Sequence, residues 1–168
     1  GCRSGRSRGS RAGRIGLASL LDGRLHVTAL EVGLGDAVYI RTPGGRQVLV
    51  DGGSDASRTM AALGTRMPFW DRSLDLVILI SPDPQRLAGL IPVLSRLEVE
   101  MVGYSPEDTE VPYYDQWSAL VGARQPGTSG VLAAGQCWML DEEVVLDLLW
   151  PPDGQIDPLV LRLGYGDI

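Results

Sequence analysis

The sharpest change between apolar and polar positions lies between residues 74 and 94. An apolar run, Leu76 to Ile80, gives way to the polar segment Ser81 to Arg86, and a second apolar segment follows at helical spacing. This pattern predicts a buried strand, a tight loop at its carboxyl end and a helix that packs back onto the sheet. Pro92 lies in the early turns of that helix, where it costs least if the helix starts near Gly89. In α/β folds such loops carry functional groups, because a rigid scaffold holds them where they reach solvent.

The chain before this segment shows the alternation of short strands. Residues 25–32, 37–41 and 47–50 are expected as strands, separated by turn signals at 33–36 and 43–45. Strands so close together predict an antiparallel meander.

A helix is expected directly after the meander. Ser54 or Asp55 can cap its first turn, and Met60 and Leu63 fall on its inner face. The second half of the chain predicts one further helix at 113–123 and strands at 99–104, 131–132, 137–140, 144–150 and 159–163.

Composition agrees with a single globular domain of mixed α/β class. The chain has 168 residues, 44% of them hydrophobic, and its 22 glycines and 11 prolines indicate many turns. A net charge of −6 argues against a broad nucleic-acid-binding face but allows a local basic groove. The sequence contains no apolar run near the ~20 residues that a membrane-spanning helix needs.

The first residues differ from the rest of the chain. All five charged side chains in residues 1–14 are arginines, and glycine and serine dominate between them. We therefore expect a disordered basic leader over residues 1–22 and a folded domain over residues 23–168. The leader is either a solvated tail or an electrostatic tether to lipid or nucleic acid.

Two cysteines, Cys2 and Cys137, are too few and too far apart to indicate a disulfide framework. Cys137 lies in a predicted strand, where a buried thiol is the expected state.

Four short motifs carry a resemblance. Residues 33–37 read GLGDA, residues 49–53 read LVDGG, residues 79–89 read LISPDPQRLAG, and residues 159–166 read LVLRLGYG. In this order they resemble the C-terminal metallo-β-lactamase-like domain of the ComEC family of competence proteins. These are membrane proteins that pass single-stranded DNA into bacteria. The resemblance implies a four-layer αββα sandwich, here truncated at the C-terminus because the chain stops just after the turn that follows residues 159–163.

The third motif departs from the family pattern at the positions that carry its chemistry. Ser81 and Arg86 stand where the family has histidines, Gln85 stands where it has an aspartate, and only Asp83 matches. The family would use two divalent ions, Zn or Mn, to activate water for cleavage of DNA. Because serine and glutamine are poor ligands and arginine carries a fixed positive charge, we assign no metal ligand, no catalytic residue and no cofactor.

Several interpretations stay open at this point. Asp83 is either a surviving ligand or a loop residue between two prolines. Arg86 either binds a phosphate or forms a salt bridge to Asp83, Asp51 or solvent. Asp36 and Asp51 are candidates close to the site, although the two glycines after Asp51 can simply permit a tight turn.

Two other residue types have a plain and a functional interpretation. His26, the only histidine, is expected to be a strand residue with an ordinary hydrogen bond rather than a metal ligand. The four tryptophans are expected in the core and its rim rather than as stacking platforms for bases.

Three hypotheses for function follow. The first is a degenerate, non-catalytic domain with a structural or DNA-guiding role in competence, whose partners are single-stranded DNA and the membrane-embedded channel of a ComEC-like parent protein. Such a domain would be associated with the membrane through that parent, on its extracytoplasmic face. The second is an active nuclease that binds Mg²⁺ or Mn²⁺ through Asp36, Asp51 and Asp83. The third is a fragment with no independent function.

Overall fold

The computed structural model describes residues 3–4, 22–105, 110–150 and 159–166, and a six-stranded sheet forms its centre. The sheet contains, in spatial order, β2 (His26–Ala29), β3 (Val38–Arg41), β4 (Gln47–Val50), β5 (Ser73–Leu79), β6 (Glu98–Tyr104) and β7 (Ser129–Val131). The first three strands pair antiparallel, as the predicted meander requires, and β4 to β7 pair parallel.

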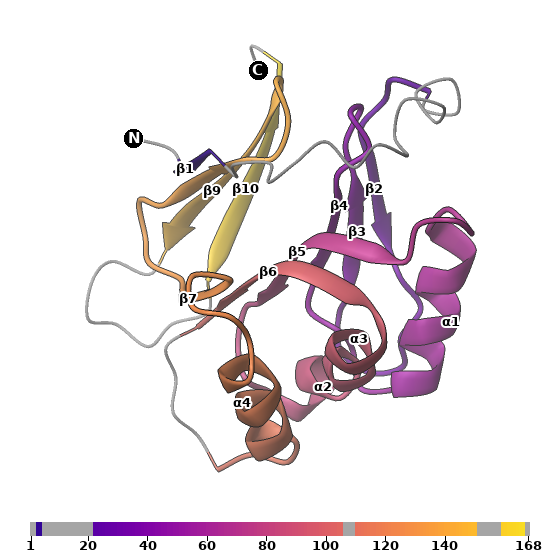
Figure 1. Ribbon diagram of the computed structural model, residues 1–168, viewed down its shortest axis with the longest axis vertical. Coiled ribbons are helices and arrows are strands. Elements are labelled where there is room, and N and C mark those ends of the chain that lie inside the picture. Colours follow the sequence, from indigo (N-terminus) through magenta and orange to yellow (C-terminus); the bar gives the residue numbers. More distant parts are fainter. Residues whose placement is uncertain (1–2, 5–21, 106–109, 151–158, 167–168) are drawn as a thin grey trace.

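Four helices cover one face of this sheet (Figure 1). They are α1 (Ala56–Arg66), α2 (Pro84–Leu87), α3 (Leu90–Arg96) and α4 (Tyr114–Gly122). Leu63, Leu90, Val93 and Trp117 from these helices pack against Leu49, Val77 and Leu79 of the sheet in one hydrophobic core.

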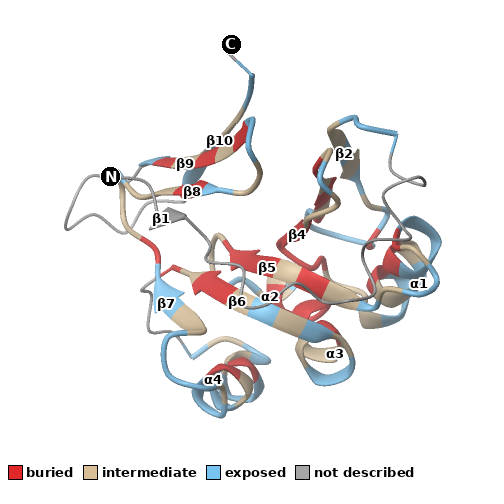
Figure 2. Cartoon of the chain, turned by 45° about the horizontal axis from the view of Figure 1, so that its top comes forward, coloured by how far each residue is buried: buried red, intermediate tan, exposed pale blue. Residues whose placement is uncertain are grey.

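A second, four-stranded sheet lies over the other face. It contains β1 (Arg3–Ser4), β8 (Cys137–Met139), β9 (Val144–Trp150) and β10 (Val160–Tyr165) in that order. A second core, which includes Trp138, Leu146 and Leu148, fills the space against Val48 and Ile78 of the large sheet. The described residues therefore form three layers, helices over sheet over sheet, with buried positions on both faces of β4 and β5 (Figure 2).

The expected helix corresponds to α3, which begins at Leu90, and the short helix α2 lies in the segment that was expected to be a loop. The chain breaks between α2 and α3 at Ala88 and Gly89. A Cβ atom at Gly89 would lie 1.8 Å from the carbonyl oxygen of Gly52, so the backbone passes too close to the loop after β4 for any side chain. Pro92 lies in the first turn of α3, where its missing N–H costs little.

Two findings differ from the sequence-based expectations, one in the leader and one at Cys137. Arg3 and Ser4, within the expected leader, form β1 and pair parallel with β8, whereas the rest of the leader lies outside the described residues apart from Asp22. Cys137 is disulfide-bonded, so the expected buried thiol is wrong. The only other cysteine of the sequence, Cys2, lies outside the described residues.

Candidate functional site

The candidate site residues converge at one end of the strands of the large sheet, beyond the carboxyl ends of β4 and β5. Asp51 follows β4 directly, and the loop Ser81–Asp83 with the short helix α2 follows the parallel strand β5. Asp36 precedes β3, and because β3 runs antiparallel to β4, this turn reaches the same end. The Gly53 N–H donates to the Asp36 carbonyl oxygen over 3.1 Å, which ties the turn to the end of β4.

Backbone hydrogen bonds hold these segments together. The Gly52 N–H donates to the Arg86 carbonyl oxygen over 2.9 Å, and the Gly89 N–H donates to the Gly53 carbonyl oxygen over 3.0 Å. Thr59 of α1 adds a buried hydroxyl that donates to the Gly52 carbonyl oxygen. Thr59 was missed in the sequence analysis; its polar side chain on the inner face of a predicted helix was the available signal.

Glycines are required where the segments touch. A Cβ atom at Gly35 would lie 2.0 Å from the Gln85 carbonyl oxygen, and one at Gly52 would lie 2.6 Å from the Leu90 nitrogen. Gly53 also has a φ of +69°, a conformation that side chains rarely adopt. The expectation that the Asp51-Gly52-Gly53 motif serves a tight turn is therefore consistent with the geometry.

Asp51 is the most constrained residue of the site. Its side chain is only 4% exposed, and its backbone has a φ of +57°, which is uncommon for a residue with a side chain. The Ile80 N–H donates to Oδ1 over 2.8 Å, and Nε of Arg86 lies 3.6 Å from Oδ2. A strained backbone and a buried carboxyl at the same position indicate a residue held in place by the surrounding loops.

Burial dominates the titration of this carboxyl. It raises the pKa of Asp51 from 3.8 to about 7, although the hydrogen bond from Ile80 and the positive charge of Arg86 both lower it. The negative charges of Asp36 and Asp83 raise the pKa of Asp51 further. The loose ion pair with Arg86 thus compensates only part of the cost of burying a charge.

Arg86 lies at the rim of this arrangement. Its side chain is 28% exposed, and within the described part of the chain its ion pair is with Asp51. Of the salt-bridge partners considered from the sequence, the geometry therefore selects Asp51. This ion pair engages Nε, and the outer edge of the guanidinium forms no ion pair with a carboxylate among the described residues.

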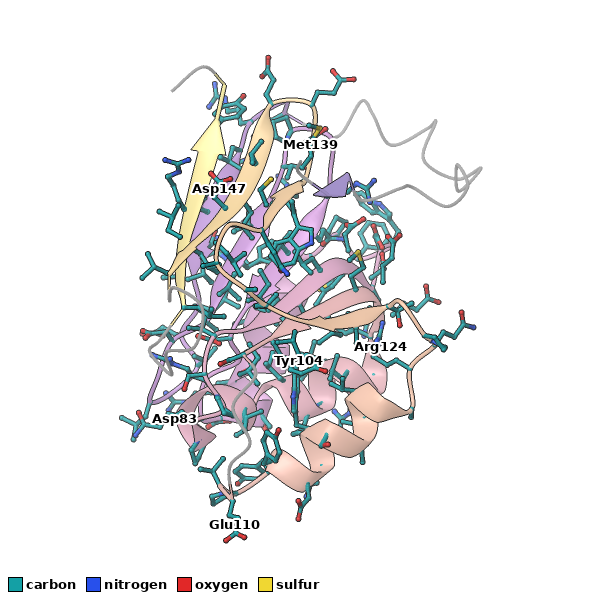
Figure 3. All side chains as sticks on the ribbon, turned by 90° about the vertical axis from the view of Figure 1, so that its left-hand side faces the viewer. Asp83, Tyr104, Glu110, Arg124, Met139 and Asp147 are labelled. Atoms are coloured by element: carbon teal, nitrogen blue, oxygen red, sulfur yellow. The ribbon has the colours of Figure 1, made fainter. Side chains whose placement is uncertain are left out.

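Asp83 has a structural task. It caps the N-terminus of α2, with its Oδ1 accepting from the Gln85 N–H over 2.7 Å, and it is exposed. Figure 3 shows it at one end of the molecule, far from Met139 and Asp147 of the second sheet. Gln85 is exposed and Ser81 is half-buried in the same loop.

These residues do not fit a pair of divalent ions. No three His, Cys, Asp or Glu residues in the described ranges lie so that they could hold a metal ion. The motif itself supplies one hydroxyl, one amide, one carboxylate already used as a helix cap, and one guanidinium. A cation would have to bind beside the fixed positive charge of Arg86, and the repulsion between the two charges opposes its binding.

An open groove of about 750 Å³ lies beside the site. The turn Gly33–Leu34, the start of α1 at Ser54–Arg58, Ala88 and Tyr113 form its walls. Leu34, Arg58 and Tyr113 are exposed, and Tyr113 has a φ of +72°.

His26 lies at the opposite end of the strands, level with the amino end of β4. It pairs with Arg41 in the β2–β3 register, and its Nε2 lies 2.7 Å from Oδ2 of Asp22. This pairing lowers the pKa of Asp22. The geometry agrees with the expected strand residue that makes an ordinary hydrogen bond.

Two of the four tryptophans are in the core, as expected. Trp117 and Trp138 are buried, whereas Trp70 is 44% exposed.

Comparison with solved structures identifies the fold. Rm3 metallo-β-lactamase matches with a TM-score of 0.59 and 18% identity over 84% of this chain and 54% of its own. A Cronobacter sakazakii (Enterobacter sakazakii) metallo-β-lactamase described by a HARLDQ motif matches with a TM-score of 0.58 and 14% identity, over 84% of this chain and 58% of its own. Zn²⁺-bound PqqB from Methylobacterium extorquens matches with a TM-score of 0.52 and 14% identity, over 99% of this chain and 57% of its own.

The chain therefore has the metallo-β-lactamase fold, as the resemblance implied, and spans just over half the length of these proteins. No family model and no curated protein matches the chain. The finer assignment to the ComEC family stays a prediction.

Proposed function

We propose that this chain is a degenerate, non-catalytic metallo-β-lactamase-fold domain of a ComEC-like DNA-uptake protein. The observation that carries the proposal is the pairing of Arg86 with the buried carboxylate of Asp51. A built-in guanidinium supplies the positive charge that this end of the sheet would otherwise obtain from a bound ion.

The role that remains is structural or DNA-guiding. The groove beside the site supports the second alternative, since its exposed side chains include an aromatic ring, Tyr113, and a guanidinium, Arg58, whose Nε lies 3.6 Å from Oδ2 of Asp55 in the same wall. Single-stranded DNA is bound by stacking of bases on aromatic rings and by basic groups along the backbone. The expected ligand is thus a short single strand, bound without cleavage.

The disulfide of Cys137 supports the proposed location. Disulfides persist in oxidising compartments and are rare in the cytosol of mesophiles. This agrees with a domain on the extracytoplasmic face, attached through the membrane-embedded channel of its parent protein. Within the described residues, no helix is long and apolar enough to cross a bilayer.

Titration calorimetry with Mn²⁺ and Zn²⁺ on the purified chain tests the proposal, with an unfolding curve to establish that the protein is folded. We expect a folded chain with no stoichiometric binding and no cleavage of single-stranded DNA. Stoichiometric binding at micromolar affinity, or cleavage that is lost in Asp83→Ala, would overturn the non-catalytic assignment.

For DNA guiding, Tyr113→Ala and Arg58→Ala should each weaken binding of a fluorescent oligonucleotide, whereas the exposed control Val160→Ala should not.

A second candidate is a hydrolase with an atypical carboxylate site. Asp36 and Asp83 lie close enough to act on the pKa of Asp51, so three carboxylates share one end of the sheet. The HARLDQ motif of the Cronobacter protein also contains Arg and Gln in a protein called a metallo-β-lactamase. This candidate predicts cleavage of single-stranded DNA that a chelator abolishes. The remaining alternative, a fragment with no function, predicts that the isolated chain shows no cooperative unfolding.

A further inference from the structure

Two aromatic rings project from the loop between α1 and β5. Phe69 is 86% exposed and Trp70 is 44% exposed, and their rings meet edge to face with centroids 4.6 Å apart. Contiguous exposed apolar patches mark sites that contact another protein or a membrane, and two adjacent aromatic rings form the start of such a patch.

The loop is well anchored and does not collapse onto the core. Met67 is buried beneath it, its N–H donates to the Leu63 carbonyl oxygen, and the Asp71 N–H donates to the Pro68 carbonyl oxygen over 3.0 Å. Asp71 also accepts from the N–H and the hydroxyl of Ser73. The chain therefore holds a tight turn whose tip presents both rings to solvent.

Two arginines flank the tip, and the acidic side chains close to it are those of Asp71 and Glu98. Arg66 ends α1 and Arg72 precedes β5, and both are exposed. Neither forms an ion pair with another residue among those that the structure describes. Asp71 is half-buried and bonded to Ser73, whereas Glu98 of β6 is exposed beside Arg72. The exposed charges of residues 66–72 are therefore the two guanidinium groups, and one exposed carboxylate lies next to them.

We propose that this loop, residues 66–72, binds the surface of a lipid bilayer that contains anionic headgroups. Trp and Phe rings settle at the boundary between headgroups and acyl chains, where an amphipathic ring is favoured on both sides. Flanking arginines bind headgroup phosphates at the same depth. A projecting tip with two aromatic rings and two flanking arginines matches the chemistry of a headgroup layer, which surrounds the tip on all sides.

The loop at residues 66–72 is separate from the candidate site around Asp51, and the membrane proposal does not depend on the proposed function. Helix α1 starts beside Asp51 and ends at this loop, and its 11 residues span about 16 Å. In Figure 1 the last turn of α1 leads into β5 and away from α2. A failure of either proposal therefore leaves the other standing.

Vesicle co-sedimentation tests the proposal on the full chain. The vesicles are phosphatidylcholine alone or phosphatidylcholine mixed with phosphatidylglycerol. We expect binding to the mixed vesicles, weakened about tenfold or more in Phe69→Ser/Trp70→Ser and in Arg66→Glu/Arg72→Glu. The control Leu149→Ser removes an apolar side chain that is 48% exposed on the second sheet, and it should bind like the parent chain.

Three outcomes would overturn the inference. The first is no binding of the parent chain to either vesicle. The second is binding that both loop variants retain. The third is self-association by size-exclusion chromatography that Phe69→Ser/Trp70→Ser abolishes in a chain that does not bind vesicles, which would assign the rings to a protein interface.

Discussion

Two aspartate–arginine pairs lie at opposite ends of the same two strands, and they differ in almost every respect. At the amino end, Nη1 of Arg46 lies 2.8 Å from Oδ1 of Asp75, and the Gln47 N–H donates to Oδ2 over 2.7 Å. At the carboxyl end, Arg86 lies 3.6 Å from Asp51, whose other oxygen accepts from one N–H.

The amino-end pair makes close hydrogen bonds that join β4 to β5, whereas the carboxyl-end pair is longer and depends on the surrounding loops for its position. Both oxygens of Asp75 have close donors, and a buried hydrogen bond from the Tyr39 hydroxyl to Gln47 over 2.6 Å extends the same network. Asp51 is more deeply buried yet less well paired, and its pKa is raised to about 7. A protein gains little stability from such a carboxyl, and a buried carboxyl with a raised pKa is a typical feature of a candidate functional site.

The largest expected effect comes from separating the segments that hold Asp51. Gly89→Ala places a Cβ atom against the Gly52 carbonyl oxygen, and neither backbone can move without losing a hydrogen bond. We expect a loss of about 5 kcal/mol in the free energy of unfolding, measured by urea denaturation. Gly64→Ala is the matched control, because nothing lies within 4 Å of its Cβ position in α1; it should gain roughly 1 kcal/mol. Equal effects of the two changes would show that the close contact does not exist in solution.

The pH dependence of stability should reveal the raised pKa of Asp51. Because the folded-state pKa of Asp51 is raised from 3.8 to about 7, the folded state binds the proton more tightly. Stability from this group is then present at low pH and lost as pH rises from about 4 through about 7. Asp51→Asn should remove this dependence, so its stability relative to the parent chain rises by about 4 kcal/mol between pH 4 and pH 8. A flat difference across this range would mean that Asp51 is ionised throughout.

The amino-end pair should show the cost of losing a close partner. Arg46→Ala leaves Asp75 with its backbone donor but without its guanidinium, so we expect a loss of roughly 2 kcal/mol at pH 7. Urea denaturation of Arg46→Ala beside the exposed control Arg58→Ala measures it. A loss no greater than that of the control would place this pair with ordinary surface ion pairs.

The smallest effect is expected from the carboxyl-end pair. Arg86→Ala removes a cation that is 3.6 Å from Asp51, so we expect a loss of about 1 kcal/mol at pH 8. At pH 5 the loss should nearly vanish, because Asp51 is then protonated and has no charge to pair. A loss as large as that of Arg46→Ala at both pH values would contradict the distinction between the two pairs.

Local patterns in the sequence predicted much of the fold. The strands β2 to β6 and the helices α1 and α4 lie close to their expected ranges, because each has its own periodicity and its own turn signals. The short helix α2 within the expected loop was not predictable in this way. Neither was the contact between Gly89 and Gly52, which are far apart in sequence.

The candidate site was predictable in its location but not in its chemistry. The loops after β4 and β5 could be placed at the same end of the sheet, because these two strands are parallel neighbours. The positive φ of Asp51 and its pairing with Arg86 arise from tertiary packing, which no local pattern encodes. The disulfide of Cys137 was missed because cysteine spacing alone does not show which strands become neighbours.

Strand β4 lies between the antiparallel and the parallel halves of the large sheet, and all four of its residues are buried. Its neighbours on both sides and the cores on both faces must separate before its amide hydrogens can meet water. Amide exchange at Gln47–Val50 should consequently follow global unfolding, while β2 at the sheet edge exchanges through local opening. The strand that ends at Asp51 thus makes the candidate site part of the last unit of the molecule to open.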